Sequence, residues 1–191
     1  MDRARSLLAD ACVTGAITAL ATFAIPALGR AARGVPVAAP VNAESHVLWG
    51  DEAASHDDVS LRYTGAGAAT HFGACLFWGG IYEAAMGDAR RSTDAADWGG
   101  AAATALGAYV LDYHLLPRRF TPGFEMRYSP GDMIAFFATF IAVLPLRRSL
   151  ARRIQAPAPP PGADVQAQPP AKSQRRRTPH VFADRMPFGI A

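Results

Sequence analysis

Residues 11–28, ACVTGAITALATFAIPAL, form an uncharged apolar run with arginines before and after it. A helix that spans a bilayer needs about 20 mostly apolar residues, and this run nearly supplies them before its flanks are counted. A surface helix of a soluble protein would carry a polar face, which this run lacks. The run therefore predicts a membrane-spanning helix near residues 7–29.

A cleaved signal peptide is the alternative interpretation of this first run. Arg3 and Arg5 give it a basic start, and small residues around Ala24 to Ala27 resemble a cleavage site. The run is long for a signal peptide, and more apolar segments follow it. We therefore favour a retained helix.

Three further uncharged runs follow, and they predict helices near residues 63–86, 97–116 and 131–150. The uncharged part of the last run is only about 21 Å long at 1.5 Å per residue. It spans a bilayer if Arg147 and Arg148 extend to the lipid headgroups. We therefore expect an all-α fold, a membrane-embedded bundle of four transmembrane helices over residues 1–154.

Composition supports a membrane protein with a different C-terminal segment. Of the 191 residues, 50% are hydrophobic and 18% are charged, and the charges gather outside the uncharged runs. Residues 155–191 are rich in proline and arginine and poor in apolar side chains, which predicts a disordered tail. Their basic charge suits anionic lipid headgroups. We expect the lipid bilayer, a homo-oligomer or a membrane-protein partner as contacts, with no nucleic acid and no cofactor.

Arginine placement predicts the orientation of the chain in its membrane. Cytoplasmic segments of membrane proteins carry an excess of lysine and arginine. Arg147, Arg148, Arg152 and Arg153 follow the last predicted helix directly, so we expect both termini in the cytoplasm. The abundance of alanine, glycine and arginine is typical of a GC-rich bacterial genome, and we expect the protein in a bacterial inner membrane.

Small residues at a spacing of four predict close packing between the helices. The first helix carries one such stripe, and the next two carry two each. The stripes are Ala11, Gly15 and Ala19; Gly65, Ala69 and Gly73; Gly67, His71, Cys75 and Gly79; Gly99, Ala103 and Gly107; and Thr104, Ala108 and Asp112.

Four ionisable residues lie within or near the predicted spans, where charge is costly. His71 and Asp112 fall at one depth on antiparallel neighbours, which predicts an intramembrane hydrogen-bonded pair that fixes helix register. The alternative is a proton relay or ligand site built on this pair. Asp10 and Glu83 lie near the cytoplasmic surface, and we expect them to be interfacial acids. Their expected partners are Arg3, Arg5, Arg90 and Arg91.

The connection between the first two helices is rich in potential metal ligands. His46, Asp51, His56 and Asp57 could hold a divalent cation, but they do not form a recognised metal-binding pattern. The other interpretation is a solvated loop in which Asp57, Asp58 or Ser60 caps the second helix. Common catalytic motifs are absent from the sequence. A shared helix face for His71 and Cys75 does not make a nucleophile with its base, so we do not expect an enzyme.

Three stretches, NAESHVLWG (42–50), THFGACLFWGGIYE (70–83) and DYHLLPRRFTPGFE (112–125), together resemble small uncharacterised multi-pass inner-membrane proteins of proteobacteria. The resemblance covers roughly residues 40–126 and implies a membrane protein but no activity. The residues that it marks are His46, Trp49, His71, Trp78, Glu83, Asp112 and Glu125. We expect a non-catalytic scaffold, accessory or envelope-stress component. A small oligomeric transporter or proton-relay unit is the first alternative, and a membrane enzyme at the outer face is the second.

Overall fold

The computed structural model of this chain describes residues 2–155, so the predicted disordered tail lies outside the described residues apart from Gln155. These residues form helices and no strand, which confirms the all-α prediction. The long elements are α1 (Asp2–Ala32), α4 (Ala66–Met86), α5 (Asp94–Val110) and α6 (Pro130–Val143), and α7 (Leu146–Gln155) follows α6.

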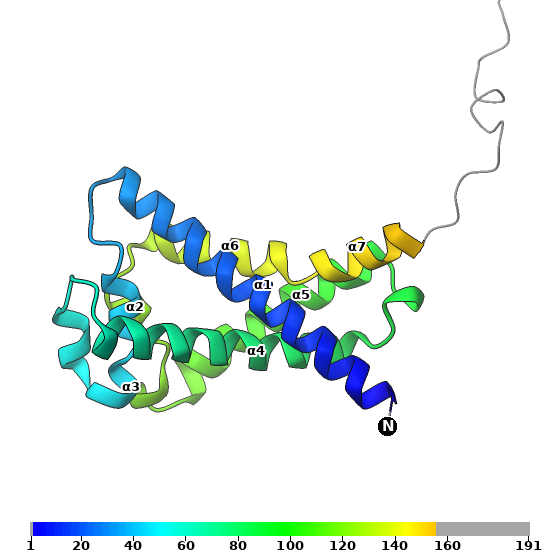
Figure 1. Cartoon of the computed structure of the whole chain (residues 1–191), viewed down its shortest axis with the longest axis horizontal. Coiled ribbons are helices and arrows are strands. Elements are labelled where there is room, and N and C mark those ends of the chain that lie inside the picture. The colour runs from blue at the N-terminus through cyan, green and yellow to red at the C-terminus, as the bar shows by residue number, and fades with distance from the viewer. Residues whose placement is uncertain (1, 156–191) are drawn as a thin grey trace, which may run out of the picture. The chain divides into compact units, whose positions relative to one another are not determined.

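The four long helices alternate in direction (Figure 1). Contacts of α1 with α4, α4 with α5, α5 with α6 and α6 with α1 close a ring. One end of the bundle holds residues 33–65 and 111–129, and we name it the loop end. The other end holds the start of α1, residues 87–93 and α7, and we name it the arginine-rich end.

Two helices within residues 2–155 are long and apolar enough to cross a membrane, Ala4–Ala32 and the α6–α7 segment Pro130–Gln155. Only 33% and 39% of their most apolar windows are buried inside the protein. A core helix of a soluble protein would be mostly buried, so their outward apolar side chains suit lipid. The helices α4 and α5 are not among these two, and a four-span bundle remains a prediction.

The observed helix bounds differ from the predicted ones most clearly at four places. The predicted helix 131–150 breaks at Leu144 and Pro145, because proline has no N–H to donate to the preceding turn. A π-helical turn, Leu61–Gly65, precedes α4, and another, Leu111–Leu115, ends α5. Gln155, which was predicted to begin the tail, is the last residue of α7.

The connection between α1 and α4 is folded, and the prediction of a solvated loop is wrong for its first part. All six residues of α2 (Ala39–Glu44) are buried, and α3 (His46–Trp49) follows at once. A Cβ atom on Gly67 of α4 would lie 1.7 Å from the Val41 carbonyl oxygen, so only glycine admits α2 here. The predicted cap by Ser60 is confirmed, since its Oγ accepts from the Tyr63 N–H at 3.1 Å.

The helices α1 and α4 cross at a contact that has room only for glycine. A Cβ atom on Gly79 would lie 2.8 Å from the Gly15 backbone nitrogen. Of the two predicted stripes on α4, the one with Gly67, His71, Cys75 and Gly79 is buried, whereas Ala69 and Gly73 are exposed. Small residues therefore bring the two backbones together, as expected when lipid gives helices no hydrophobic drive to associate.

Alanine at position 79 should destabilise the bundle, whereas alanine at position 73 should not. Gly79→Ala places a methyl group against the α1 backbone, and such overpacking costs about 1–3 kcal/mol. Gly73→Ala meets open space and gains up to about 1 kcal/mol of helix propensity. Thermal unfolding of both variants in the same detergent checks this. Equal melting temperatures would contradict the close crossing.

Candidate functional site

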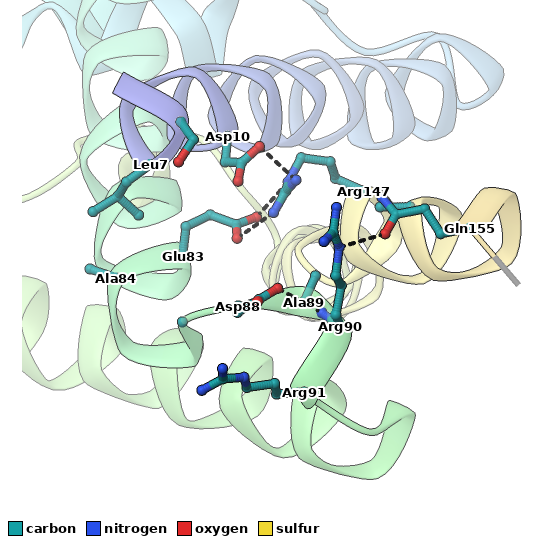
Figure 2. Close-up of a pocket in the computed structure, with 13 residues that line it drawn as sticks. Leu7, Asp10, Glu83, Ala84, Asp88, Ala89, Arg90, Arg91, Arg147 and Gln155 are labelled. Carbon is teal, nitrogen blue, oxygen red and sulfur yellow. Dashed lines mark hydrogen bonds and ion pairs between the residues drawn. The ribbon is translucent and has the colours of Figure 1, made fainter. Parts of the chain in front are cut away.

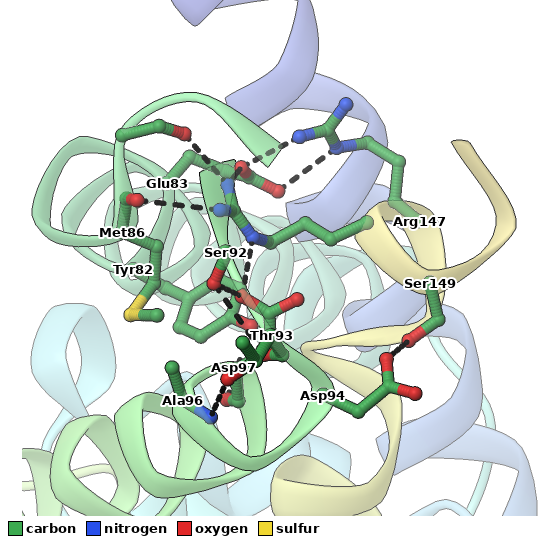
Figure 3. A network of polar contacts seen from close by, with 12 residues as sticks. Tyr82, Glu83, Met86, Ser92, Thr93, Asp94, Ala96, Asp97, Arg147 and Ser149 are labelled. Atoms are coloured by element: carbon green, nitrogen blue, oxygen red, sulfur yellow. Dashed lines mark hydrogen bonds and ion pairs between the residues drawn. The ribbon is translucent and has the colours of Figure 1, made fainter. Parts of the chain in front are cut away.

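The buried carboxylate of Glu83 is the centre of a polar cluster at the arginine-rich end (Figure 3). Its oxygens accept from Nε of Arg147 at 2.9 Å and from Nη2 of the same residue at 2.6 Å. Nη1 of Arg148 donates at 3.0 Å, and the Thr14 hydroxyl donates at 2.5 Å. Side chains of α1 and α7 thus meet on one residue of α4.

Arg148 extends this cluster from α4 to α5. Its side chain is 0% exposed, and Nε donates to Asp97 Oδ1 at 2.8 Å. Nη1 also donates to the Gly87 carbonyl at 2.8 Å. Asp97 accepts further from the Ser92 hydroxyl at 2.7 Å and from Arg152. A buried charge without such partners would cost several kcal/mol. Here Arg148 and Asp97 compensate each other, and the remaining hydrogen bonds satisfy their other polar atoms.

The predicted partners of the interfacial acids are wrong. Asp10 binds Nη1 of Arg147 at 2.7 Å, and Glu83 binds Arg147 and Arg148. These two arginines were expected to extend to the headgroups. The reason for the difference is the break before α7, which starts a new helix whose first arginines reach the buried acids of α4 and α5.

An open cavity of about 580 Å³ lies beside this cluster (Figure 2). Its walls come from the start of α1, the end of α4, residues 87–91 and α7. Asp10 and Glu83 line the cavity together with Arg147, which pairs with both acids, and Arg90 and Arg91 also line it. Each of the four segments that meet here thus contributes at least one charged side chain to the cavity.

His71 is the centre of a second buried polar group, towards the loop end. Its Nδ1 lies 3.2 Å from Glu44 Oε2, and both side chains are buried. Its Nε2 lies 3.0 Å from the Thr22 hydroxyl and 3.2 Å from the Ala19 carbonyl oxygen. The predicted pairing with Asp112 is wrong, because α2 inserts Glu44 beside His71 from a segment that sequence alone presents as a loop.

The hydrogen bonds of His71 fix where its protons are. The Ala19 carbonyl can only accept, so Nε2 carries a hydrogen. One proton then lies between Nδ1 and Glu44, and the pair has no net charge whichever atom holds it. Cys75 Sγ lies 3.8 Å from Nε2, but a protonated Nε2 cannot act as a base for this thiol. Burial raises the pKa of the Glu44 carboxyl, and His71 opposes this shift.

Asp112 lies in the π-helical turn after α5, and within the described residues its carboxyl group makes no side-chain hydrogen bond. It lines a cavity of about 30 Å³ whose wall also includes Cys75. Its electrostatic neighbour is Glu125, which accepts from Thr121 at 3.0 Å and Tyr113 at 3.4 Å. The two predicted intramembrane residues are thus separate, each with its own acidic neighbour.

The four possible metal ligands of the loop end do not converge. His46 bonds the Thr121 carbonyl at 2.8 Å, and His56 stacks on Tyr63. Asp51 and Asp57 pair with arginines instead, Arg118 at 3.7 Å and Arg127. Across residues 2–155, no three histidine, cysteine or acidic side chains are grouped to hold a metal ion.

Sequence reasoning missed several residues that the structure makes central. Glu44 and Asp97 were not singled out, because one lies in a charged segment and the other at a helix start. The threonines Thr14, Thr18 and Thr22 of α1 are all buried. Their spacing of four in an apolar run was a usable signal for a polar stripe that faces the bundle.

Comparison of this chain with protein-family models, curated proteins and solved structures gave no match.

Removing the charge of Arg148 should destabilise the protein far more than removing that of Arg153. Arg148→Met leaves Glu83 and Asp97 each without one buried charged donor, and breaking such a pair costs about 3–5 kcal/mol. Arg153 is exposed on the same helix, so Arg153→Met should stay within about 0.5 kcal/mol. Unfolding of both variants in detergent measures the difference. A mild effect of Arg148→Met would contradict its burial.

Coupling between His71 and Glu44 should be measurable, and coupling between His71 and Asp112 should be absent. Either leucine substitution in the first pair leaves its partner unsatisfied, while the double change removes both groups. Intramembrane couplings average about 0.6 kcal/mol and reach about 1.7 kcal/mol. Double-mutant cycles read by steric-trap unfolding test both pairs. A larger coupling energy for His71 with Asp112 would refute the observed arrangement.

Proposed function

We propose that the protein is a non-catalytic, multi-pass component of the bacterial inner membrane, a scaffold, accessory or envelope-stress protein. The observation that carries this proposal is the pairing of buried ionic groups between helices. Glu83, Asp97 and Arg148 are used to join α4, α5 and α7. The resemblance to small inner-membrane proteins of proteobacteria points to the same class.

The distribution of side chains on α4 and α5 supports four spans. Both helices bury polar residues in their interior-facing sides, His71 and Glu83 on α4 and Asp97 and Thr104 on α5. Both expose large apolar residues, Leu76, Phe77, Ile81, Leu106 and Val110. This is the reverse of a soluble helix, and it suits helices that turn ionisable groups to the bundle interior and apolar groups to lipid.

A small oligomeric transporter or proton-relay unit is the second candidate, and one specific observation favours it. Thr22 contacts His71 at 3.0 Å, and Thr14 donates to Glu83 at 2.5 Å. With Thr18 between them, polar groups run along α1 from one cluster to the other. Proton flux in proteoliposomes that His71→Leu abolishes would favour the relay, and equal flux with and without the protein would favour the scaffold.

Topology tests the membrane part of this proposal. A reporter fused after Ile154 should report the cytoplasm, because an even number of spans returns the chain to the side of its N-terminus. A reporter fused near His56 should report the periplasm, because one span separates this residue from the N-terminus. The protein should also stay with membranes after carbonate extraction. A periplasmic signal after Ile154 would overturn the orientation, and release by carbonate would overturn the membrane assignment.

A further inference from the structure

The cavity at the arginine-rich end has the size of a ligand site. Its volume of about 580 Å³ lies within the range of roughly 300–1,000 Å³ for small-molecule pockets. It is formed by α1, α4, α7 and residues 87–91, so a ligand there would touch four segments (Figure 2). The chemistry of its lining indicates what that ligand is.

Two of the three arginines that line the cavity, Arg90 and Arg91, form no ion pair within residues 2–155. Arg147 is neutralised by Asp10 at 2.7 Å and Glu83 at 2.6 Å. Arg90 uses only Nε, which donates to Gln155 at 2.9 Å. The side chain of Arg91 makes no hydrogen bond or ion pair within residues 2–155.

The remaining acid of the cavity is Asp88, and it is engaged by the backbone. Its Oδ1 accepts from the Arg90 N–H at 3.0 Å, where it caps the short helical turn Ala89–Arg91. The other two acids, Asp10 and Glu83, face Arg147. An anion that enters the cavity would therefore meet two sets of guanidinium donors without a partner, the Nη groups of Arg90 and the whole guanidinium of Arg91.

An exposed apolar face of α4 leads to the cavity. Phe77 is 55% exposed and Ile81 is 38% exposed. Ala84 follows at the next position of the same face, and it lines the cavity. Residues at a spacing of three or four lie on one side of a helix. A hydrocarbon chain on this face would end beside Arg90 and Arg91.

We propose that the cavity binds a phosphate group through the unpaired donors of Arg90 and Arg91, and that the headgroup of an anionic phospholipid carries this group. Guanidinium groups form paired hydrogen bonds with phosphate oxygens, and basic pockets between membrane helices hold such headgroups. The apolar face of α4 favours a lipid over free phosphate. The proposal rests on the proposed membrane location, because the arginine-rich end must lie at the bilayer surface.

Lipid binding by matched arginine-pair variants tests this site. The full chain is purified in detergent and titrated with phosphatidylglycerol, phosphatidylcholine or inorganic phosphate, with the melting temperature and native mass spectra as readouts. Phosphatidylglycerol should stabilise the protein and remain bound, and phosphatidylcholine should not. Arg90→Gln with Arg91→Gln should weaken phosphatidylglycerol about 25-fold, at roughly fivefold per arginine.

The control is the other adjacent pair, Arg118→Gln with Arg119→Gln, at the loop end. Both double variants keep the basic tail and lose the same number of charges, but Arg118 and Arg119 do not line the cavity. Equal loss of phosphatidylglycerol binding in the two variants would overturn the site. Stabilisation by inorganic phosphate that depends on Arg90 and Arg91 would support a phosphate site but assign it to a soluble ligand.

Folding and membrane insertion are measured apart from lipid binding. Arg90 and Arg91 are exposed, so the lipid-free melting temperature of their double variant should match that of the unchanged protein. If the melting temperature of the double variant falls, lipid binding by the single variant Arg91→Gln tests the site, because this side chain has no described partner to lose. Loss of binding with normal topology supports the site. Unchanged binding with normal topology overturns the site but leaves the proposed function standing.

Discussion

The Glu83 carboxylate makes the contact on which the arrangement of the helices depends. It lies on α4, receives the Thr14 hydroxyl from α1, and binds Arg147 and Arg148 from α7. Arg148 continues to Asp97 of α5. Any shift of one helix would leave a buried charge unpaired, at a cost of several kcal/mol. The cluster therefore determines which helices are neighbours, even where its net contribution to stability is small.

At the loop end too, a buried ionisable group needs a partner, and a short helix supplies it. The short helix α2 packs on α4 at Gly67 and places Glu44 beside His71, in a pair without net charge. Between the two ends, Thr18 and Thr22 donate to backbone carbonyls of their own helix. The middle of the bundle is then free to pack through small residues, and the Gly15–Gly79 crossing uses that freedom.

The long helices could be predicted because a membrane span needs a long uncharged run, which is a local property of sequence. The partners of the polar residues could not, because they depend on segments without that signal. The sequence places His71 and Asp112 at a similar depth on two predicted helices, but the partner of His71 is Glu44, which the short helix α2 brings in from outside them. The predicted fourth helix was extended through Pro145 to reach the length of a span. The observed break at this proline is what allows Arg148 to reach the buried Asp97, and this contact was therefore not predicted.

The buried polar groups of α1 are poorly arranged to transfer a proton, whereas the cavity has donors available to bind an anion. A relay needs a group that accepts a proton and passes another on. The Thr22 hydroxyl contacts His71, yet its own hydrogen is directed to the Thr18 carbonyl oxygen at 2.7 Å, and a carbonyl passes no proton on. The chain of donors thus ends within α1. At the arginine-rich end, Arg91 has donors without described partners and faces an open cavity. Binding at this surface therefore requires no rearrangement of the core, whereas transfer through the core would.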